Sequence, residues 1–460
     1  MTTGRPGGGR PDSMPGTGRK APPRLGPEPP RGMRDILPDE VELRDVTAET
    51  ILAVYRRYGF RRVETPALEN IQLLTRGEGG ENEKLIFKVL KRGEKLDLGA
   101  ATSEADLVDL GLRFDLTVPL ARYYANNHAR LPRPLKAVQI GPVWRAERQQ
   151  RGRYRQFTQC DIDILGMTSY VAEVELILAT TEALTALGLR NLTVRLNDRR
   201  ILVGMASRCG FDPSRYNSVF VALDKLDRHD QAAVIKEMEE AGHPTAAISK
   251  LVGLLSSFDP VTAPHRGLNE MRQQLGEDAS VEAFDALAMI SRMVSEEAGD
   301  SWRIRFDPTL VRGMSYYTGP IFEIGSAEFP SSIAGGGRYD ELIGKILGQD
   351  VPATGFSIGF ERVVSILTER AGTRRPGERR IAMIFEEGTD DLKRVLQAAR
   401  QLRGEGIAVS LEIRGKRLSA QLAMLESHGF DGVVVFDGAD RPAVRWFEDQ
   451  PRRADREARS

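Results

Sequence analysis

The chain has 460 residues, which is enough for two or three domains that each bury a core of their own. Apolar residues make up 41% and charged residues 28%, the balance of an ordinary globular protein, and no apolar run approaches the length of a membrane span. The formal net charge is zero, so any contact with nucleic acid must come from local basic patches and not from a field around the whole chain.

Residues 1–30 are rich in glycine, proline and arginine, and such a segment cannot bury enough apolar surface to fold. We therefore expect a disordered basic tail here. The apolar residues that follow recur at helical spacing and predict a helix from about Glu40 to Arg57. Gly59 helps to end this helix, and "FRRVETP" after it predicts a strand that Pro66 closes.

Short alternating runs between Lys84 and Asp115 ("KLIFKVL", "EKLDL", "LRFDL") predict antiparallel strands. Two longer strands, "LKAVQIGPVWRAE" and "FTQCDIDILG", flank a basic segment, and "VAEVELILATTEALTAL" predicts the next helix. Residues 198–285 are helical and polar in pattern and contain none of the strongest motifs. We expect them to form an inserted helical subdomain.

Strand patterns return in "WRIRFDPTLVRGMSYYTGPIFEIG", "SSIAGGGRYDELIGKIL" and "TGFSIGFERVVSILTER". Residues 380–446 then alternate strand and helix, which predicts a small α/β domain with a mostly parallel sheet, and residues 447–460 form a tail. The two cysteines, Cys160 and Cys209, lack the spacing of metal ligands. We expect both to be buried in a cytoplasmic protein, and we predict no metal held by the chain.

The basic segment "WRAERQQRGRYRQF" contains five arginines and one carboxylate between two predicted strands. The planar guanidinium group matches phosphate oxygens, so the segment could bind a nucleotide or an RNA backbone, or it could be a solvated hairpin. The common phosphate cradles GxxxxGK[ST] and GxGxxG after a strand are absent from the sequence. The glycines of "AGGGRYD" predict a tight bend or a close approach of the backbone to another group, although a plain turn is an alternative.

Five segments in order carry a family resemblance, from about Pro30 to Glu369. "RYGFRRVETP", "VWRAERQQRGRYRQFTQCDIDILG" and "GFSIGFERV" resemble motifs 1, 2 and 3 of the class II aminoacyl-tRNA synthetases. "LRFDLTVPLARYY" and "LVRGMSYYTGPIFE" with "AGGGRYD" resemble the histidine-binding segments of the histidyl-tRNA synthetase family. The resemblance implies an α+β fold: an antiparallel sheet flanked by helices over residues 31–375, with the helical insertion, followed by an anticodon-binding-like α/β domain.

The resemblance also implies roles for individual residues. Arg145 and Arg312 would be the catalytic arginines, which stabilise charge on the α-phosphate of ATP while the histidine carboxylate attacks it. Asp163 would select the imidazole together with Tyr317, and Phe157 would stack on adenine. The implied ATP site consists of Arg145, Glu147, Phe157 and Arg362. The implied histidine site consists of Asp115, Thr117, Arg145, Gln159, Asp163, Arg312, Tyr316, Tyr317 and Tyr339. The implied tRNA contacts are Arg148, Gln150, Arg151 and Arg153.

Several of these residues also have purely structural explanations. Asp115 could cap the helix that "LTVPLARYY" predicts, and Tyr316 and Tyr317 could lie in the core of a strand. An arginine such as Arg312 inside an apolar pattern is harder to explain in this way, because a buried guanidinium needs a partner. The same argument applies to Asp163, because a buried carboxylate also needs a partner.

The implied activity is that of a histidine–tRNA ligase, with L-histidine, ATP with Mg²⁺, and histidine tRNA as reactants. Motif 1 builds a two-fold interface in this fold, so the expected assembly is a homodimer without membrane attachment. The alternative is the inert relative of the fold that serves as a regulatory subunit of ATP phosphoribosyltransferase. That relative normally lacks the C-terminal domain and has eroded ATP-binding arginines, whereas here Arg145, Arg312 and Arg362 are present and the domain is at least partly present.

The sequence departs from the usual family pattern in three features. Met314 and Ser315 stand where the family usually has Leu-Asp, and the chain after "VVVFDG" is short for the C-terminal domain. In addition, "RFDL" and "QCDIDILG" follow the archaeal and eukaryotic style of the family. A duplicated copy with altered tRNA duties therefore stays open as a second alternative.

Overall fold

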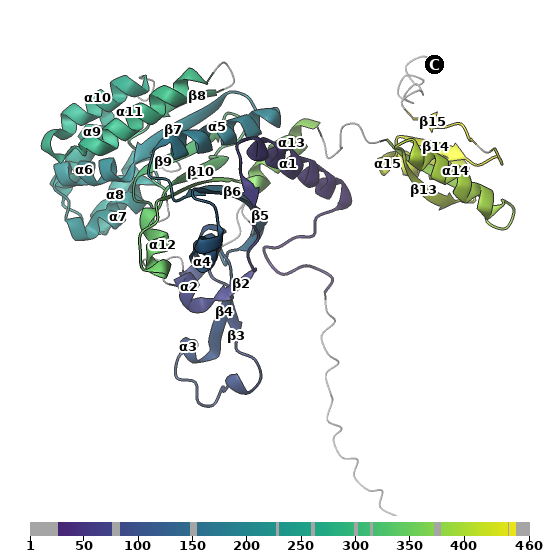
Figure 1. The fold of residues 1–460 in the computed structure, drawn as a ribbon, viewed down its shortest axis with the longest axis horizontal. Coiled ribbons are helices and arrows are strands. Elements are labelled where there is room, and N and C mark those ends of the chain that lie inside the picture. The colour runs from purple at the N-terminus through teal and green to yellow at the C-terminus, as the bar shows by residue number, and fades with distance from the viewer. Residues whose placement is uncertain are drawn as a thin grey trace, which may run out of the picture.

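The computed structural model describes residues 26–75, 83–147, 154–226, 230–258, 263–298, 302–312, 316–371, 379–439 and 441–447. Within these residues the strands form sheets of eight, four and three strands. Figure 1 shows the eight-stranded sheet inside a main body with helices on it, and the four-stranded sheet in a C-terminal unit of its own. We describe the two separately.

The main sheet is antiparallel across its middle, as predicted. In spatial order its strands are β1 (Arg61–Arg62), β5 (Leu135–Trp144), β6 (Gln156–Leu165), β11 (Ala353–Ile358), β10 (Ala334–Arg338), β9 (Pro320–Ser326), β7 (Leu192–Asp198) and β8 (Trp302–Phe306). All neighbours from β5 to β7 pair antiparallel, while β1 and β8 join the two edges in parallel. The segment "FRRVETP" thus contributes only the two-residue edge strand β1.

Side-chain alternation along β6 gives the main sheet two different faces. Cys160, Ile162 and Ile164 are buried in the largest apolar core, beneath the helices α1 (Pro38–Arg57), α5 (Val171–Ala186) and α13 (Phe360–Ala371). The residues between them point the other way, toward the side of the sheet that carries α4 (Thr117–Asn127) and α12 (Asp340–Leu347). Because Asp161 and Asp163 belong to this second set, the polar site lies on the face opposite α1 and α5.

Helix α1 forms where the sequence predicts it and begins two residues earlier than expected. Pro38 occupies its first turn, where a missing N–H costs nothing, and Asp39 and Glu40 lie at the positive end of the helix dipole. The helix ends at Arg57, and Gly59 adopts a positive φ of 83° just beyond it.

Along the chain, the strands of the three-stranded sheet come after α1 and before the long strands β5 and β6. It consists of β2 (Leu68–Asn70), β4 (Val108–Leu112) and β3 (Lys88–Leu90), with the short helices α2 (Ile71–Thr75) and α3 (Glu104–Leu107) and the 3₁₀ turns η1 (Glu83–Leu85) and η2 (Gly93–Lys95). All its pairs are antiparallel. The run "EKLDL" was expected to be a strand but lies in η2 and the turn after it, so that prediction is wrong: its alternation has no neighbouring strand to pair with.

Helices occupy the region expected to be an insertion and continue past it. They are α6 (Arg199–Cys209), α7 (Tyr216–Leu223), α8 (Gln231–Glu240), α9 (Thr245–Ser256), α10 (Pro264–Leu275) and α11 (Val281–Glu296), with the 3₁₀ turns η4 (Pro213–Arg215) and η5 (Gly276–Asp278); η3 (His128–Arg130) follows α4. Side chains cap several of them: Asp198 accepts a hydrogen bond from the N–H of Arg200, and Asp230 accepts one from that of Ala233.

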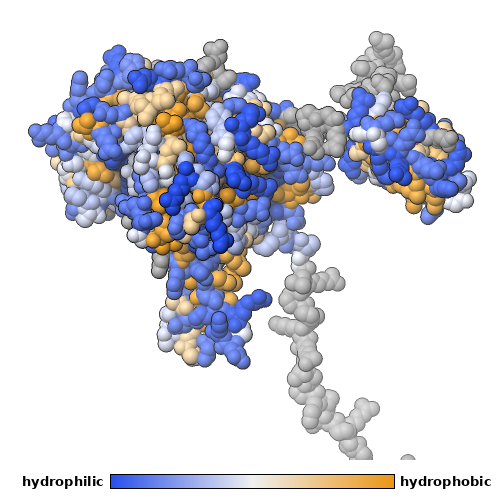
Figure 2. All heavy atoms as spheres, in the orientation of Figure 1, coloured by the Kyte–Doolittle hydropathy of each residue, from blue (hydrophilic) through white to orange (hydrophobic). Residues whose placement is uncertain are grey.

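The C-terminal unit has the predicted alternation of strand and helix. Its elements are β12 (Arg380–Phe385), α14 (Leu392–Gly404), β13 (Ala408–Ile413), α15 (Leu418–Ser427), β14 (Gly432–Val435) and β15 (Arg445–Trp446). The first three strands pair in parallel, and β15 adds an antiparallel edge that the sequence pattern did not predict. Leu396 and Ile413 are exposed here, and Figure 2 shows apolar residues among the hydrophilic ones on the visible face of this unit.

Both cysteines are free and buried, as expected. Among the described residues, none of the helices combines the length and the apolar composition needed to cross a bilayer.

Candidate functional site

A cavity of about 260 Å³ opens on the acidic face of the main sheet, over β6, β11 and β10. It collects residues that lie far apart in the sequence, including almost all of the predicted site. The predicted residues that line it are Thr117, Arg145, Glu147, Phe157, Gln159, Asp163, Arg312, Tyr316, Tyr317, Tyr339 and Arg362. Asp115 is fully buried and does not line the cavity, and the predicted tRNA contacts Arg148, Gln150, Arg151 and Arg153 lie outside the described residues.

Strand β6 places three polar side chains in a row on the cavity face. Gln159, Asp161 and Asp163 are two residues apart, so the pleat directs all three to the same side. Each is at most 9% exposed. Sequence reasoning selected the outer two and missed Asp161, although the alternation of "QCDID" already placed it between them.

Glycines on the neighbouring strands make room for the charged side chains. A Cβ atom on Gly355 would stand 2.0 Å from Oδ1 of Asp163, and one on Gly335 would stand 2.1 Å from Nη1 of Arg312. A Cβ atom on Gly337 would approach the ring of Tyr317 to 2.9 Å. The predicted close approach at "AGGGRYD" is therefore confirmed, and the alternative of a plain turn is wrong, because these glycines lie in the central strand β10.

Asp163 is fixed within a cluster of tyrosines. The hydroxyl of Tyr339 donates a 2.5 Å hydrogen bond to Oδ1 of Asp163, while Oδ2 has no partner among the described residues. The ring of Tyr316 lies 4.9 Å from that of Tyr317 and 5.8 Å from that of Tyr339. Tyr316 and Tyr317 stand in a turn before β9, so the alternative that they form the core of a strand is wrong.

Arg312 is half-buried and has a charged partner. Its Nη1 donates a 2.9 Å hydrogen bond to Oε2 of Glu323 on β9, and Glu323 also receives Arg195 at 3.2 Å. Burial opposes the charge of Arg312, but Tyr317 and Glu323 raise its pKa above the ordinary value. Arg312 thus stays cationic beside the cavity, where the carboxylate of Glu323 on β9 holds it.

Asp161 and Asp163 line one end of the cavity, and the buried Asp115 lies close enough for its charge to act on both. Burial raises the pKa of Asp163 to about 7 and that of Asp115 to about 6, although a hydrogen bond from Tyr339 or from the N–H of Val118 opposes the shift. Burial and the neighbouring Asp163 hold the pKa of Asp161 well above its ordinary range. Such a group of buried acids is suited to a ligand that brings positive charge or N–H donors.

Asp115 serves the helix and the site together. Its Oδ1 accepts a 3.1 Å hydrogen bond from the N–H of Val118 in the first turn of α4, which agrees with the capping alternative. Its Oδ2 is buried without a partner among the described residues. One oxygen therefore fixes the carboxylate, and the other stays available.

The other end of the cavity is built from arginines and aromatic rings. Nε of Arg145 donates a 3.0 Å hydrogen bond to the carbonyl of Phe114, and its guanidinium lies 5.0 Å from the centre of the Phe157 ring. Arg362 donates a hydrogen bond to the carbonyl of Ser332. These groups are half-buried, and a planar ligand with phosphates would find stacking surfaces and cations here.

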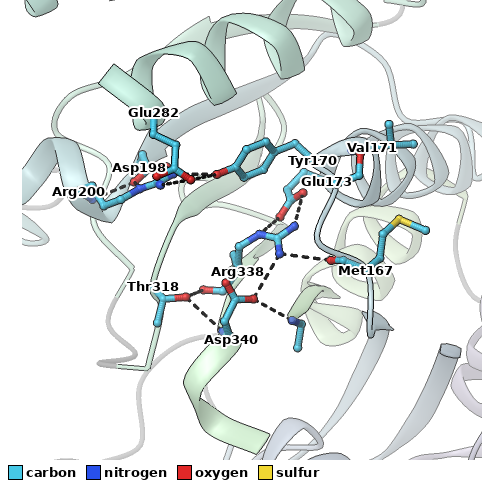
Figure 3. A network of polar contacts seen from close by, with 12 residues as sticks. Met167, Tyr170, Val171, Glu173, Asp198, Arg200, Glu282, Thr318, Arg338 and Asp340 are labelled. Atoms are coloured by element: carbon cyan, nitrogen blue, oxygen red, sulfur yellow. Dashed lines mark hydrogen bonds and ion pairs between the residues drawn. The ribbon is translucent and has the colours of Figure 1, made fainter. Parts of the chain in front are cut away.

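A polar network on the opposite face of the sheet supports the tyrosine cluster (Figure 3). Arg338, next to Tyr339, forms two hydrogen bonds with the carboxylate of Glu173 on α5, at 2.8 and 2.9 Å. Asp340 accepts a hydrogen bond from Arg338, and its N–H donates to the hydroxyl of Thr318, which follows Tyr317. The two segments that carry the tyrosines are thus joined to each other and to α5.

A second ion pair ties α1 and α13 to β6. Arg44 on α1 donates hydrogen bonds of 2.6 and 2.8 Å to the two carboxylate oxygens of Glu361, which precedes Arg362. Glu361 also accepts a 2.9 Å hydrogen bond from the N–H of Thr158. Sequence reasoning missed this pair, since its members are separated by 317 residues.

Comparison with known proteins agrees with this geometry. The family model for histidyl-tRNA synthetase matches residues 32–363. A histidine–tRNA ligase from Leifsonia xyli subsp. xyli is 44% identical over 427 residues, which cover 90% of this chain and 96% of that protein. One from Aeropyrum pernix is 37% identical and covers 86% of each chain.

Solved structures resemble the fold. The crystal structure of histidyl-tRNA synthetase from Nostoc sp. PCC 7120 superimposes with a TM-score of 0.72 at 27% identity, over 90% of this chain and 92% of that one. A structure from Bacillus halodurans, described as an ATP phosphoribosyltransferase regulatory subunit/histidyl-tRNA synthetase, gives a TM-score of 0.68 at 23% identity. It covers 88% of this chain and 97% of that one, and at this identity it shows the fold alone.

Proposed function

The chain belongs to the histidyl-tRNA synthetase family, and from this membership we infer that it is a histidine–tRNA ligase that activates L-histidine with ATP and charges histidine tRNA. The observation that carries the inference is the single cavity in which Arg145 and Arg312 meet the buried acid Asp163. Two cations suit the reacting anions, and the acid suits the imidazole.

In the first step a carboxylate oxygen of histidine attacks the α-phosphorus of ATP. A new P–O bond forms, the bond to the β-phosphate oxygen breaks, and pyrophosphate leaves. Arg145 and Arg312 act as the catalytic residues, because two guanidinium groups already in place offset the repulsion between the anions. In the second step a terminal ribose hydroxyl of the tRNA attacks the carbonyl carbon and AMP leaves.

At the amino-acid end, Asp163 accepts a hydrogen bond from one imidazole nitrogen and Tyr317 pairs with the other, while Tyr316 and Tyr339 enclose the ring. Asp115, Thr117 and Gln159 bind the α-amino group. A buried acid also discriminates against apolar analogues of histidine, because they would leave its oxygen without a donor.

At the nucleotide end, Arg145 contacts the α-phosphate, Glu147 lies on the adenine side and Arg362 covers one adenine face. Phe157 stacks on the other face, which requires Arg145 to leave the ring that it covers now. The basic segment with Arg148, Gln150, Arg151 and Arg153 binds the acceptor end of the tRNA.

We propose that Mg²⁺ enters together with the phosphates of ATP as part of the substrate. The described residues offer no group of three or more His, Cys, Asp or Glu side chains that could hold a metal ion. Mg²⁺ is commonly bound through one or two carboxylates and substrate phosphates, so a site made by the protein alone is not needed.

The organisation proposed for the chain has a catalytic domain at residues 31–375 with a helical insertion from residue 198, and an anticodon-binding-like domain at residues 380–446. The assembly is a homodimer in the cytoplasm. Exposed apolar side chains at Leu37, Val41 and Leu68, near the start of α1 and on β2, support a two-fold contact there.

The first test is histidine-dependent exchange of labelled pyrophosphate into ATP by the purified protein. Exchange supports the ligase, whereas histidine binding without exchange supports the regulatory alternative. Arg312→Lys should slow exchange by about 10²–10³-fold, since Lys cannot reproduce the planar fork. Charging of purified histidine tRNA then distinguishes the tRNA ligase from an enzyme that passes the adenylate elsewhere.

A further inference from the structure

We propose that Asp161 is a specificity-determining residue that binds the α-ammonium group of histidine, as a second carboxylate beside Asp115. The proposal rests on the function proposed above and deepens it. It gives the middle residue of the β6 row a direct contact with the substrate, in addition to the residues that the motifs indicate.

The position of Asp161 is fixed by the sheet. It lies between Gln159 and Asp163 on β6 and pairs in register with Ser357 on β11. It lines the same cavity as both of its neighbours and is 3% exposed. A side chain in this place contacts little bulk solvent, so its partners come from the cavity or from the residues around it.

The hydrogen bonds around Asp161 leave an acceptor free. Nε2 of Gln159 donates a 3.4 Å hydrogen bond to the hydroxyl oxygen of Ser357, and the Ser357 hydroxyl in turn bonds to Asp161. Oδ1 of Asp161 and Oε1 of Gln159 are then buried without a partner among the described residues. Buried polar atoms are almost always paired in native proteins, so these two acceptors call for a donor that arrives with a ligand.

Asp115 adds a third acceptor to this end of the row, because its Oδ2 is also buried and without a partner in the described structure. An ammonium group has three N–H donors and no acceptor, which matches the oxygens of Gln159 and Asp161 that line the cavity, with Asp115 buried behind the lining. Asp163 also has one oxygen without a partner among the described residues, but it lies two residues further along β6, where Tyr339 bonds to its other oxygen.

Arg145 indicates which end of the ligand Asp161 meets. It directly follows Trp144, the last residue of β5, which pairs with Gln156 at the start of β6, and along β6 Asp161 is two residues closer to that end than Asp163. The carboxylate of histidine must reach Arg145 to react, and the α-ammonium is attached to the neighbouring carbon. Asp161 therefore faces the backbone end of histidine, and Asp163 faces the imidazole end.

The test compares Asp161→Asn with Asp163→Asn against three ligands: histidine, histidinol, which keeps the ammonium, and 3-(imidazol-4-yl)propionate, which lacks it. Binding is measured by titration calorimetry on the full chain. Asp161→Asn should weaken histidine and histidinol about 10- to 100-fold and leave the propionate unchanged. Asp163→Asn should weaken all three.

Equal weakening of all three ligands by Asp161→Asn, or unchanged histidine binding, would overturn the proposal. Ser357→Ala provides a second variant should Asp161→Asn fail to fold: loss of the hydroxyl that holds Asp161 should weaken histidine several-fold and spare the propionate. If the wild type neither binds nor activates histidine, the proposed function itself fails, which differs from a wild type that does both while the variants show no discrimination.

Discussion

At the proposed amino-acid end of the cavity the acids are buried and the charged side chains bond to side chains from other segments, whereas at the proposed nucleotide end they are half-buried and lie near strand ends and loops. Asp163 is held by Tyr339, and Arg312 by Glu323. Arg145 instead rests on the ring of Phe157, a contact that a stacked base would replace. The difference suggests that selection of the amino acid depends on fixed geometry, while nucleotide binding depends on side chains that change partners.

The largest effect is expected at Glu173, which pairs with Arg338 on the other face of the sheet from the tyrosine cluster. Its side chain is fully buried and pairs with Arg338, which is 5% exposed. Glu173→Gln should leave the Arg338 charge poorly compensated and lower the free energy of unfolding by about 3–5 kcal/mol, measured by urea denaturation. The matched control is Glu282→Gln at the exposed end of the same network in Figure 3, where the expected loss is below about 1 kcal/mol.

If Glu173→Gln changed stability no more than Glu282→Gln, the ion pair would not be what supports the tyrosine cluster. Should the variant fold, its KM for histidine should rise more than its KM for ATP, because Arg338 precedes Tyr339.

The buried acids also predict how the ligand-free protein responds to pH. The folded pKa of Asp163 is about 7 and that of Asp115 about 6, both above the ordinary values of an exposed aspartate. Their contribution to stability is therefore fully present below about pH 4 and is lost as pH rises through 6 and 7, at about 1.4 kcal/mol per unit of pKa shift. Thermal unfolding should show a lower Tm at pH 8 than at pH 5.

Asp163→Asn removes one of the titrating groups while it keeps an oxygen for Tyr339, so its Tm should depend less on pH across this range. A slope as steep as that of the wild type would mean that the acids of the cavity do not titrate in this window. Histidine should reduce the slope in the wild type, because donors from the ligand stabilise the ionised carboxylates.

A smaller effect is expected where a glycine makes room for the acid. Gly355→Ala places a methyl group 2.0 Å from Oδ1 of Asp163, and the carboxylate must shift. Overpacking of this kind costs about 1–3 kcal/mol, so the Kd for histidine should rise about 5- to 150-fold while ATP binding stays the same. Gly325→Ala on β9 is the control, because nothing lies within 4 Å of the added Cβ. An equal change in the Kd for histidine in the two variants would contradict the idea that Gly355 makes the room that Asp163 needs.

Sequence reasoning found what is local and missed what is assembled from distant segments. The long strands β5 and β6 and helix α5 follow from periodicity, and the proposed site residues come from the motifs that carry the family resemblance. By contrast, Glu323, Glu361 and Glu173 act through arginines that come from other elements of the fold, and no local pattern marks them. Asp161 is the exception among the missed residues, because the alternation of side chains along β6 alone would have placed it on the cavity face.

The smallest effect is expected at the nucleotide end, where Phe157→Leu removes the ring that we expect to stack on adenine. Stacking of a base on an aromatic ring contributes about 1–3 kcal/mol, but ATP must first displace the Arg145 guanidinium, whose contact with the ring contributes about 0.5–1 kcal/mol. The net loss should be about 1 kcal/mol, seen as a five- to tenfold rise in the KM for ATP in pyrophosphate exchange. The Kd for histidine without ATP should stay the same, because Phe157 lies at the other end of the cavity. A loss of histidine affinity as large as the loss for ATP would show that the two ends are not independent, since Arg145, once released from the ring, would then disturb the acids around Asp161.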